Sequence, residues 1–143
     1  MVCETEYELL DQIGRGSYGK VYKARHDSGE VHAIKIVELE ADEDDLDSIQ
    51  QEIQMLQAFN CSQLTRYYGS FVVGSALWIV MEYLEGGSLQ GLIKSSANNL
   101  DEATTQWILK EVLKALAYLH AERKIHRDVK AGNILVAADA SVR

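Results

Sequence analysis

The 143-residue chain contains no proline, only 2 cysteines and no apolar run long enough to predict a membrane-spanning helix. Nothing in the sequence explains the missing proline. Cys3 and Cys61 lie far apart and lack the spaced partners of a metal site, so we expect a reduced, cytoplasmic protein. The N-terminal segment MVCETEYELLDQ lacks the basic and then apolar order of a signal peptide. Basic residues are also scarce, and the net charge of −8 argues against a nucleic-acid-binding surface.

Five segments predict β-strands, because β-branched and aromatic residues gather in each and turn signals separate them. In chain order they are YELLDQI, KVYKARH, EVHAIKIVEL, TRYYGSFVV and ALWIVMEYL. Between the third and fourth, SIQQEIQMLQAFN carries Ile49, Ile53 and Leu56 at helical spacing. We therefore expect an antiparallel sheet of five strands with one inserted helix, followed by a mainly helical part. That order is typical of an α+β fold in two unequal pieces.

The second part is predicted to begin with a short helix in EGGSLQGLIKSS and to continue with a long one from about residue 101 to 121. Asp101 is a suitable N-cap for the long helix. Apolar residues at helical spacing predict one broad buried face on it. That face would comprise Leu109, Val112, Leu113, Leu116, Leu119 and His120. The remaining residues predict a loop that leads into a short hairpin.

Residues 13–24, IGRGSYGKVYKA, match two nucleotide-binding motifs by their letters. Gly14, Gly16 and Gly19 have the GxGxxG spacing of a dinucleotide-binding turn, and the run ending in Gly-Lys has most of a Walker A loop. Both motifs open a helix, whereas KVYKAR predicts a strand, and Walker A also needs a hydroxyl where Val21 stands. The remaining interpretation is a glycine-rich hairpin over a nucleotide's phosphates, since glycine lets backbone N–H groups approach phosphate oxygens.

Two charged residues fall in apolar rows. Lys35 is the only charged member of its alternating row in VHAIKIV, and Glu52 lies within the apolar stripe of the helix predicted over 48–60. Because an unpaired buried charge is very costly, one interpretation pairs the two residues and lets Lys35 also reach phosphates. In the other, Lys35 extends to water and Glu52 lies at the edge of the stripe. The pattern alone leaves both open.

Residues 125–136, IHRDVKAGNILV, match the pattern H-R-D-x-K-x-x-N at every specified position. Together with IGRGSYGKV and HAIK, in this order and spacing, the segment resembles the signature set of eukaryotic protein kinases. The resemblance covers the chain from about residue 7 to its end. Lys130 in this context is typical of the Ser/Thr class, and IQQEI, LWIVMEYLEGGS and IHRDVKAGN resemble the sterile-kinase group, nearest its germinal-centre branch.

The resemblance implies a role for each matching residue and makes ATP and Mg²⁺ the expected cofactors. Asp128 would be the catalytic residue that accepts the proton of the substrate hydroxyl. Lys130 would neutralise the transferred phosphate, and Asn133 would bind Mg²⁺. Lys35 would hold the α- and β-phosphates, and Glu52 would fix Lys35. The nucleotide-binding residues would be Ile13, Gly14, Arg15, Gly16, Ser17, Tyr18, Gly19, Val21, Ala33, Lys35, Met81, Glu82, Leu84 and Leu135.

Within that set, Met81 would be the gatekeeper, and the backbone of Glu82 and Leu84 would bind the edge of the adenine. Val21, Ala33 and Leu135 would line the adenine pocket. Met81 and Leu135 equally fit an ordinary core. The sequence departs from the family pattern at His32, where valine is more usual, and at Gly132, which could loosen the catalytic loop.

The chain contains no Asp-Phe-Gly tripeptide, whose Asp is the principal Mg²⁺ ligand of the family. We expect residues 1–84 to form the smaller lobe and hinge, and residues 85–143 a truncated start of the larger lobe, which leaves apolar surface open on the long helix. One interpretation is the front part of a kinase that phosphorylates Ser and Thr of protein substrates, inactive by itself. The other is a non-catalytic decoy or scaffold module that binds kinase regulators. We favour the first, because the catalytic residues expected in this span are all present.

Overall fold

The computed structural model describes residues 6–16, 19–39, 53–54, 56–95 and 100–143. The chain divides into two compact units, which we describe separately. The first comprises Met1–Phe59 with Arg66–Tyr83, and the second comprises Asn60–Thr65 with Leu84–Arg143. Among the described residues, no helix is long and apolar enough to cross a membrane.

The first unit contains a five-stranded antiparallel sheet, as the sequence predicts. Its strands are β1 (Tyr7–Gly16), β2 (Gly19–His26), β3 (Val31–Glu38), β4 (Tyr67–Val73) and β5 (Ala76–Glu82). The order across the sheet is β1-β2-β3-β5-β4, and every neighbouring pair is antiparallel. The turn between β4 and β5 contains Gly74, whose φ of +59° suits glycine. The described part of the helix that the sequence predicts between β3 and β4 includes residues 53–54 and 56–58.

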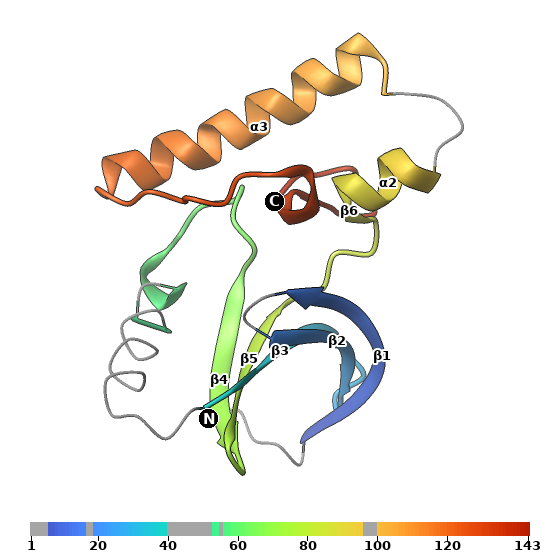
Figure 1. Ribbon diagram of the computed structural model, residues 1–143, viewed down its shortest axis with the longest axis vertical. Coiled ribbons are helices and arrows are strands. Elements are labelled where there is room, and N and C mark those ends of the chain that lie inside the picture. The colour runs from blue at the N-terminus through green and yellow to red at the C-terminus, as the bar shows by residue number, and fades with distance from the viewer. Residues whose placement is uncertain (1–5, 17–18, 40–52, 55, 96–99) are drawn as a thin grey trace. The chain divides into compact units, whose positions relative to one another are not determined.

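The sheet curls strongly, so that its two edges approach each other (Figure 1). Tyr7 on β1 stacks with Phe71 on β4 at 6.2 Å between ring centroids, although these strands are the two edges of the sheet. Ala24, Ile34 and Val80 are completely buried on the inner face. The half-buried residues packed around them are Tyr7, Leu9, Ile36, Phe71 and Trp78.

His32 also lies on this inner face, which the sequence analysis did not foresee. It is only 8% exposed, and its ring contacts those of Tyr7 and Tyr68 at 5.7 and 4.6 Å. The Tyr7 hydroxyl and His32 Nδ1 form a hydrogen bond of 3.2 Å. Burial lowers the pKa of His32 and His26 lowers it further, while Glu30 acts in the opposite direction. Histidine at this position therefore joins β1, β3 and β4 through one aromatic cluster.

The second unit is built on two helices, α2 (Leu89–Ser95) and α3 (Glu102–Ala121). Asp101 is the N-cap of α3, as predicted: its carboxylate accepts a 2.6 Å hydrogen bond from the Thr104 N–H. At the other end, the Lys124 N–H donates to the Leu119 carbonyl and the Arg123 N–H to the His120 carbonyl. These two bonds form a Schellman motif, with Arg123 in the left-handed position at φ +58°.

Only one ridge of α3 is buried, which corrects the broad face predicted from its periodicity. Ile108, Ala115 and Leu119 are buried, whereas Leu109 and Leu113 are 54% and 63% exposed and His120 is also exposed. Leu109 follows Ile108, and Leu113 follows the half-buried Val112, in each case by about 100° around the helix axis. Both side chains therefore turn away from the buried ridge. The periodicity gives the apolar positions correctly but does not specify which of them the rest of the unit covers.

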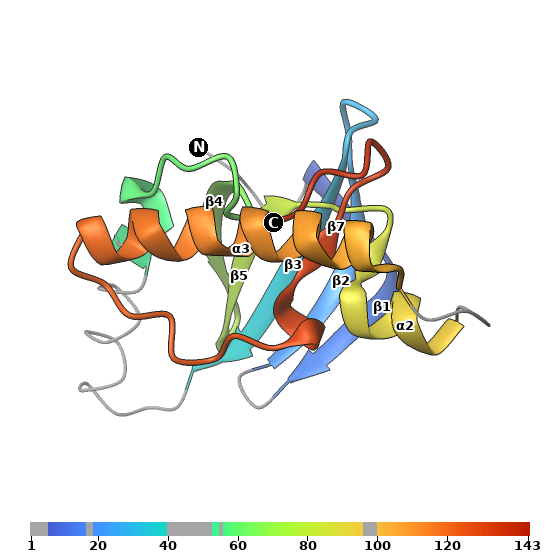
Figure 2. The same ribbon diagram turned by 90° about the horizontal axis from the view of Figure 1, so that it is seen from above.

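The core of the second unit joins α2 and α3 to the C-terminal segment. Leu89, Ile108 and Val142 are buried together, with Leu100, Val112, Ala131 and Ile134 packed against them. The short strands β6 (Gly87–Ser88) and β7 (Leu135–Val136) pair with each other, and residues Val136 and Val142 form a further bridge. The segment that follows α3 runs back along this helix (Figure 2).

Candidate nucleotide-binding face and catalytic loop

The glycine segment forms a β-hairpin and not a loop that opens a helix. Gly16 at the end of β1 faces Gly19 at the start of β2, and Gly14 faces Val21. The geometry therefore excludes the dinucleotide-binding and Walker A alternatives for this segment, because both need a helix after the glycines. Ser17 and Tyr18 lie outside the described residues. Ile13, Arg15 and Gly16 are exposed on the hairpin.

Gly19 is required by the close approach of two strands. Its φ is +130°, and a Cβ at this position would overlap the backbone oxygen of Ile36 on β3. A Cβ at Gly16 would meet no atom within 4 Å, and one at Gly14 would make ordinary contact with Val21 at 3.5 Å. The three glycines of the motif thus differ: the third maintains the sheet, and the second leaves open space above the hairpin.

The strand register brings four predicted nucleotide-binding side chains to one face of the sheet. Val21 faces Lys35 across β2 and β3, and Ala33 faces Met81 across β3 and β5. Residues that are directly opposite in an antiparallel pair lie on the same face, and so do residues two apart on one strand. This face, which we call the nucleotide face, is opposite to the aromatic inner face.

The register adds Ile79, which the sequence analysis missed. Ile79 lies directly opposite Lys35 and is only 4% exposed. Its position two residues before Met81 was the available signal, because alternation places both on the same face. The register thus gives Lys35 an aliphatic neighbour on each side, Val21 and Ile79.

Lys35 is half-buried on the nucleotide face. Its predicted partner Glu52 lies outside the described residues, so the pair stays a prediction. At the end of β5, the Glu82 N–H donates to the Arg66 carbonyl at 2.8 Å, and a ligand at Glu82 cannot use this N–H as its donor. Leu84 and Leu135 belong to the second unit, where Leu84 is buried and Leu135 is half-buried on β7.

In the second unit, three predicted residues meet in one exposed loop. Lys130 Nζ lies 2.8 Å from Asp128 Oδ2, and Asn133 Nδ2 lies 2.8 Å from the same oxygen and 2.8 Å from the Asp128 carbonyl. Asn133 ends the 3₁₀ turn η2 (Ala131–Asn133), which returns the chain towards Asp128. The spacing D-x-K-x-x-N is therefore the spacing that one short turn needs to bring a cation and an amide onto one carboxylate.

These contacts keep the Asp128 carboxyl ionised. The hydrogen bond from Lys130, then that from Asn133, lowers the pKa of Asp128 below its ordinary value. The Asp128 N–H donates to His126 Nδ1 at 3.3 Å. Arg127, between them, has a φ of +66°, a conformation that is costly for a residue other than glycine. The backbone around Asp128 is thus held in a shape that a relaxed chain would not adopt.

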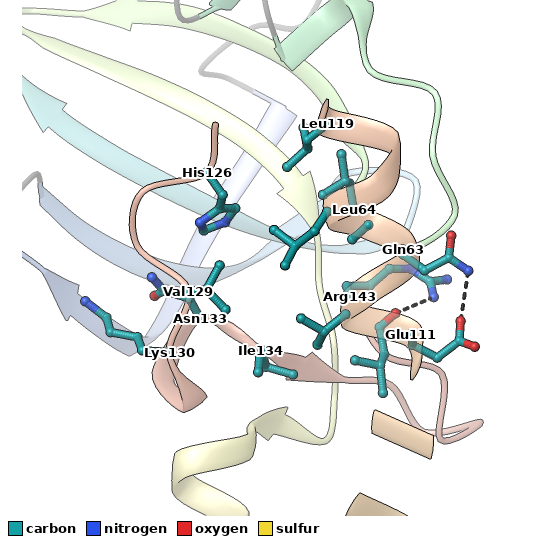
Figure 3. Close-up of a pocket in the computed structure, with 14 residues that line it drawn as sticks. Gln63, Leu64, Glu111, Leu119, His126, Val129, Lys130, Asn133, Ile134 and Arg143 are labelled. Carbon is teal, nitrogen blue, oxygen red and sulfur yellow. Dashed lines mark hydrogen bonds between the residues drawn. The ribbon is translucent and has the colours of Figure 1, made fainter. Parts of the chain in front are cut away.

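The loop is supported from both of its ends. Figure 3 shows His126, Val129, Lys130 and Asn133 around a hollow that Leu119 and Ile134 also line. After the loop, the Ile134 carbonyl accepts a 2.8 Å hydrogen bond from the Leu89 N–H at the start of α2. Gly86 permits the chain before β6 to approach β7, because a Cβ there would lie 2.6 Å from the Val136 oxygen.

Gly132, the unusual residue of the loop, lies inside η2 against α2. A Cβ at this position would lie 3.2 Å from Oε1 of Gln90, an atom at the end of a flexible side chain. An alanine here would therefore need only a small shift of Gln90. The glycine is not required by the close approach of two backbones.

The oxygen atoms of the loop could bind a cation whose remaining ligands come from elsewhere, such as phosphates and water. Both Nδ2 hydrogen bonds of Asn133 go to Asp128, which leaves the Asn133 Oδ1 as the atom of this side chain that could bind a metal. Mg²⁺ prefers oxygen ligands and is commonly bound through one or two carboxylates plus phosphates and water. Within the described part of the chain, no three His, Cys, Asp or Glu residues gather in a way that could hold a metal ion. The loop fits Mg²⁺ only as part of a larger ligand set.

Comparisons with known proteins agree with this arrangement. Residues 7–143 match the family model described as protein kinase domain. Serine/threonine-protein kinase sid1 of Schizosaccharomyces pombe (strain 972 / ATCC 24843) is 49% identical over 133 residues, which are 92% of this chain and 28% of that protein. Serine/threonine-protein kinase 1 of Arabidopsis thaliana is 44% identical over 97% of this chain and 17% of its own length.

A third relative, serine/threonine-protein kinase ppk11 of Schizosaccharomyces pombe (strain 972 / ATCC 24843), is 42% identical over 96% of this chain and 44% of its own length. The chain thus spans less than half the length of each of these curated relatives.

Proposed function

The chain belongs to the protein kinase domain family, and we propose that the protein carrying it transfers the γ-phosphate of ATP to serine or threonine hydroxyls of other proteins. The observation that carries this proposal is the convergence of Lys130 Nζ and Asn133 Nδ2 on Asp128 Oδ2, each at 2.8 Å. An ionised carboxylate, a cation and an amide on one short loop are the groups that this reaction needs. The relatives are themselves named serine/threonine-protein kinases.

In the proposed reaction, Asp128 orients the substrate hydroxyl and accepts its proton as the oxygen attacks the γ-phosphorus. The bond between that phosphorus and the bridging oxygen breaks, and ADP leaves. Lys130 neutralises charge on the transferred phosphate. The Lys130 side chain is 59% exposed while its Nζ contacts Asp128. Its ammonium group can therefore reach a phosphate beside the carboxylate. Asn133 would hold Mg²⁺ through its Oδ1, and the metal would supply positive charge that offsets the charge of the phosphates.

The nucleotide face provides the binding part of the proposal. Lys35 holds the α- and β-phosphates, and Glu52 fixes Lys35. Val21, Ala33 and Met81 provide apolar contact for adenine, with Leu84 and Leu135 from the second unit and the backbone of Glu82 at its edge. The hairpin residues Ile13, Gly14, Arg15, Gly16, Ser17, Tyr18 and Gly19 cover the phosphates.

Finer features of the proposal rest on similarity of sequence. The segments IQQEI, LWIVMEYLEGGS and IHRDVKAGN support assignment to the sterile-kinase group, near its germinal-centre branch. Residues 1–84 would then form the smaller lobe with its hinge, and residues 85–143 would begin the larger lobe. Protein substrates, regulators or scaffold proteins as partners, and a cytoplasmic location, follow from the same assignment.

The proposal is tested by incubating the whole protein that carries this chain with ATP labelled at the γ-phosphate, Mg²⁺ and a mixture of proteins, followed by phosphoamino acid analysis. We expect label on serine and threonine, and none on tyrosine. Lys35→Met should abolish transfer. Nucleotide binding without transfer, in a preparation that binds ATP with Mg²⁺, would instead support the non-catalytic decoy or scaffold module. Failure to bind nucleotide at all would contradict the proposal as a whole.

A further inference from the structure

One cation on the nucleotide face has no place in the proposed reaction. Lys23 lies on β2, two residues after Val21, and its register partner is Ala33 on β3. Ala33 in turn faces Met81 on β5. Lys23, Ala33 and Met81 therefore form one row across three neighbouring strands, on the face that also carries Lys35.

Lys23 reaches across β3 to an aromatic ring. Its Nζ lies 4.9 Å from the ring centroid of Tyr83, over the face of the ring. This distance is within the range of a cation–π interaction. β3 separates β2 from β5, and a small residue on β3 leaves room for a side chain that bridges them. Ala33, at 7% exposure, satisfies that condition.

Tyr83 occupies the position that gives this contact its significance. It is the residue between Glu82 and Leu84, whose backbone groups are proposed to bind adenine, and it is the last residue of the first unit. Both Lys23 and Tyr83 are half-buried. Within the described part of the chain, the Lys23 ammonium group makes no ion pair with a carboxylate, and its cation–π contact is with the ring of Tyr83.

We propose that Lys23 is a positioning residue for adenine binding: its ammonium group holds the ring of Tyr83 and thereby fixes the backbone segment 82–84. This inference rests on the proposed function, since it concerns the segment that would bind adenine. In this proposal Lys23 acts through Tyr83 and does not itself contact ATP. The interaction should therefore affect the affinity for the adenine moiety and leave the affinity for phosphates unchanged.

The test compares uncharged and charged ligands. Dissociation constants for adenosine, inorganic tripolyphosphate and ATP are measured by titration calorimetry with the full chain in the presence of Mg²⁺. Removing a half-buried cation–π contact corresponds to at least about a two- to five-fold change in an equilibrium constant. We expect Lys23→Met to weaken adenosine and ATP by about this factor and to leave tripolyphosphate unchanged.

The chain offers matched controls. Lys20→Met removes the same charge from the same strand, but Lys20 is exposed and three residues from Lys23, on the other face. It should leave adenosine binding unchanged. Lys23→Arg and Tyr83→Phe keep a cation and a ring face, so both should bind adenosine like the unmodified protein. Tyr83→Leu should match Lys23→Met, and the double variant should be no weaker than either single one.

Three results would overturn the inference. If Lys23→Met weakens ATP and tripolyphosphate while adenosine is unaffected, Lys23 acts only as a charge near the phosphates. If the effects of Lys23→Met and Tyr83→Leu add, the two residues do not act through each other. If Lys23→Arg weakens adenosine as much as Lys23→Met, while its thermal unfolding is unchanged, a cation at this position has no role. When the unmodified protein binds neither adenosine nor ATP, the proposed function fails together with the inference.

Discussion

Replacing Gly19 by alanine tests the role of this glycine in maintaining the sheet, apart from the proposed role of the hairpin in covering a nucleotide. Two structural features act against a Cβ at this position. The φ of +130° belongs to a region that residues other than glycine rarely adopt, and the added carbon would overlap the backbone oxygen of Ile36. Two other glycines isolate these features. At Gly29, φ is +89°, but an added Cβ would meet no atom within 4 Å. At Gly16, an added Cβ would also meet no atom within 4 Å, and φ is not in the positive region.

The expected losses of unfolding free energy follow from these differences. Gly16→Ala should change stability by less than about 0.5 kcal/mol, as for an exposed site without special geometry. Gly29→Ala should cost about 1–2 kcal/mol for its positive φ alone. Gly19→Ala adds an overpacking cost of about 1–3 kcal/mol, which gives about 2–5 kcal/mol in total. That sum is a large fraction of the roughly 5–15 kcal/mol that stabilises a typical domain.

Urea unfolding followed by tryptophan fluorescence measures these losses in the first unit. Trp78 packs against the core of the sheet, while Trp107 lies on α3 in the second unit. In a Trp107→Phe background the signal therefore reports the sheet. The urea midpoint should be highest for Gly16→Ala, lower for Gly29→Ala and lowest for Gly19→Ala. A midpoint for Gly19→Ala no lower than that of Gly29→Ala would refute the close approach of β2 to β3.

Two further predictions concern a helix end and a buried histidine. Arg123→Gly should stabilise the second unit by up to about 1 kcal/mol, because the φ of Arg123 is +58°. Glu122→Gly should destabilise it, because the φ of Glu122 is −79°. If urea unfolding shows that both variants change stability in the same direction, the helix-end geometry is contradicted. The pKa of His32 is lowered by burial, so the unfolded chain binds this proton more readily, and stability should fall as the pH drops below about 6.5. Urea midpoints at pH 7.5 and 5.5 measure that fall, and His32→Gln should reduce it. A fall that is unchanged in His32→Gln would refute the role of His32.

Local patterns were sufficient for the five strands of the sheet, for the start of α3 and for the segment 128–133. Alternating β-branched residues and the turns at Gly29 and Gly74 gave the strands, and the Asp101 cap gave the start of α3. Residues 128–133 could be singled out because the groups that meet there lie within six residues of one another. Asp128 and Asn133 meet through one turn, whatever the rest of the chain does.

Contacts between distant strands could not be predicted in the same way. Alternation along β3 places His32 on the face opposite to Lys35, but it could not show that the sheet curls and places His32 beside Tyr7 and Tyr68. The bridge from Lys23 to Tyr83 depends on the order β2-β3-β5, which no single segment encodes. Periodicity likewise could not decide which apolar residues of α3 the second unit would bury.

The most direct test of the central claim is the effect of Asp128→Asn on two measurements made on the same preparation of the whole protein that carries this chain. The amide keeps the shape of the carboxylate but cannot accept the proton of a substrate hydroxyl. ATP binding in the presence of Mg²⁺ should therefore be largely retained, while transfer of the labelled γ-phosphate to serine and threonine should be abolished. Asp139→Asn is the matched control, because the Asp139 carboxylate accepts a hydrogen bond from the Ser141 N–H outside the catalytic loop. Transfer at a near-normal rate by Asp128→Asn would contradict the assignment of Asp128 as the catalytic base.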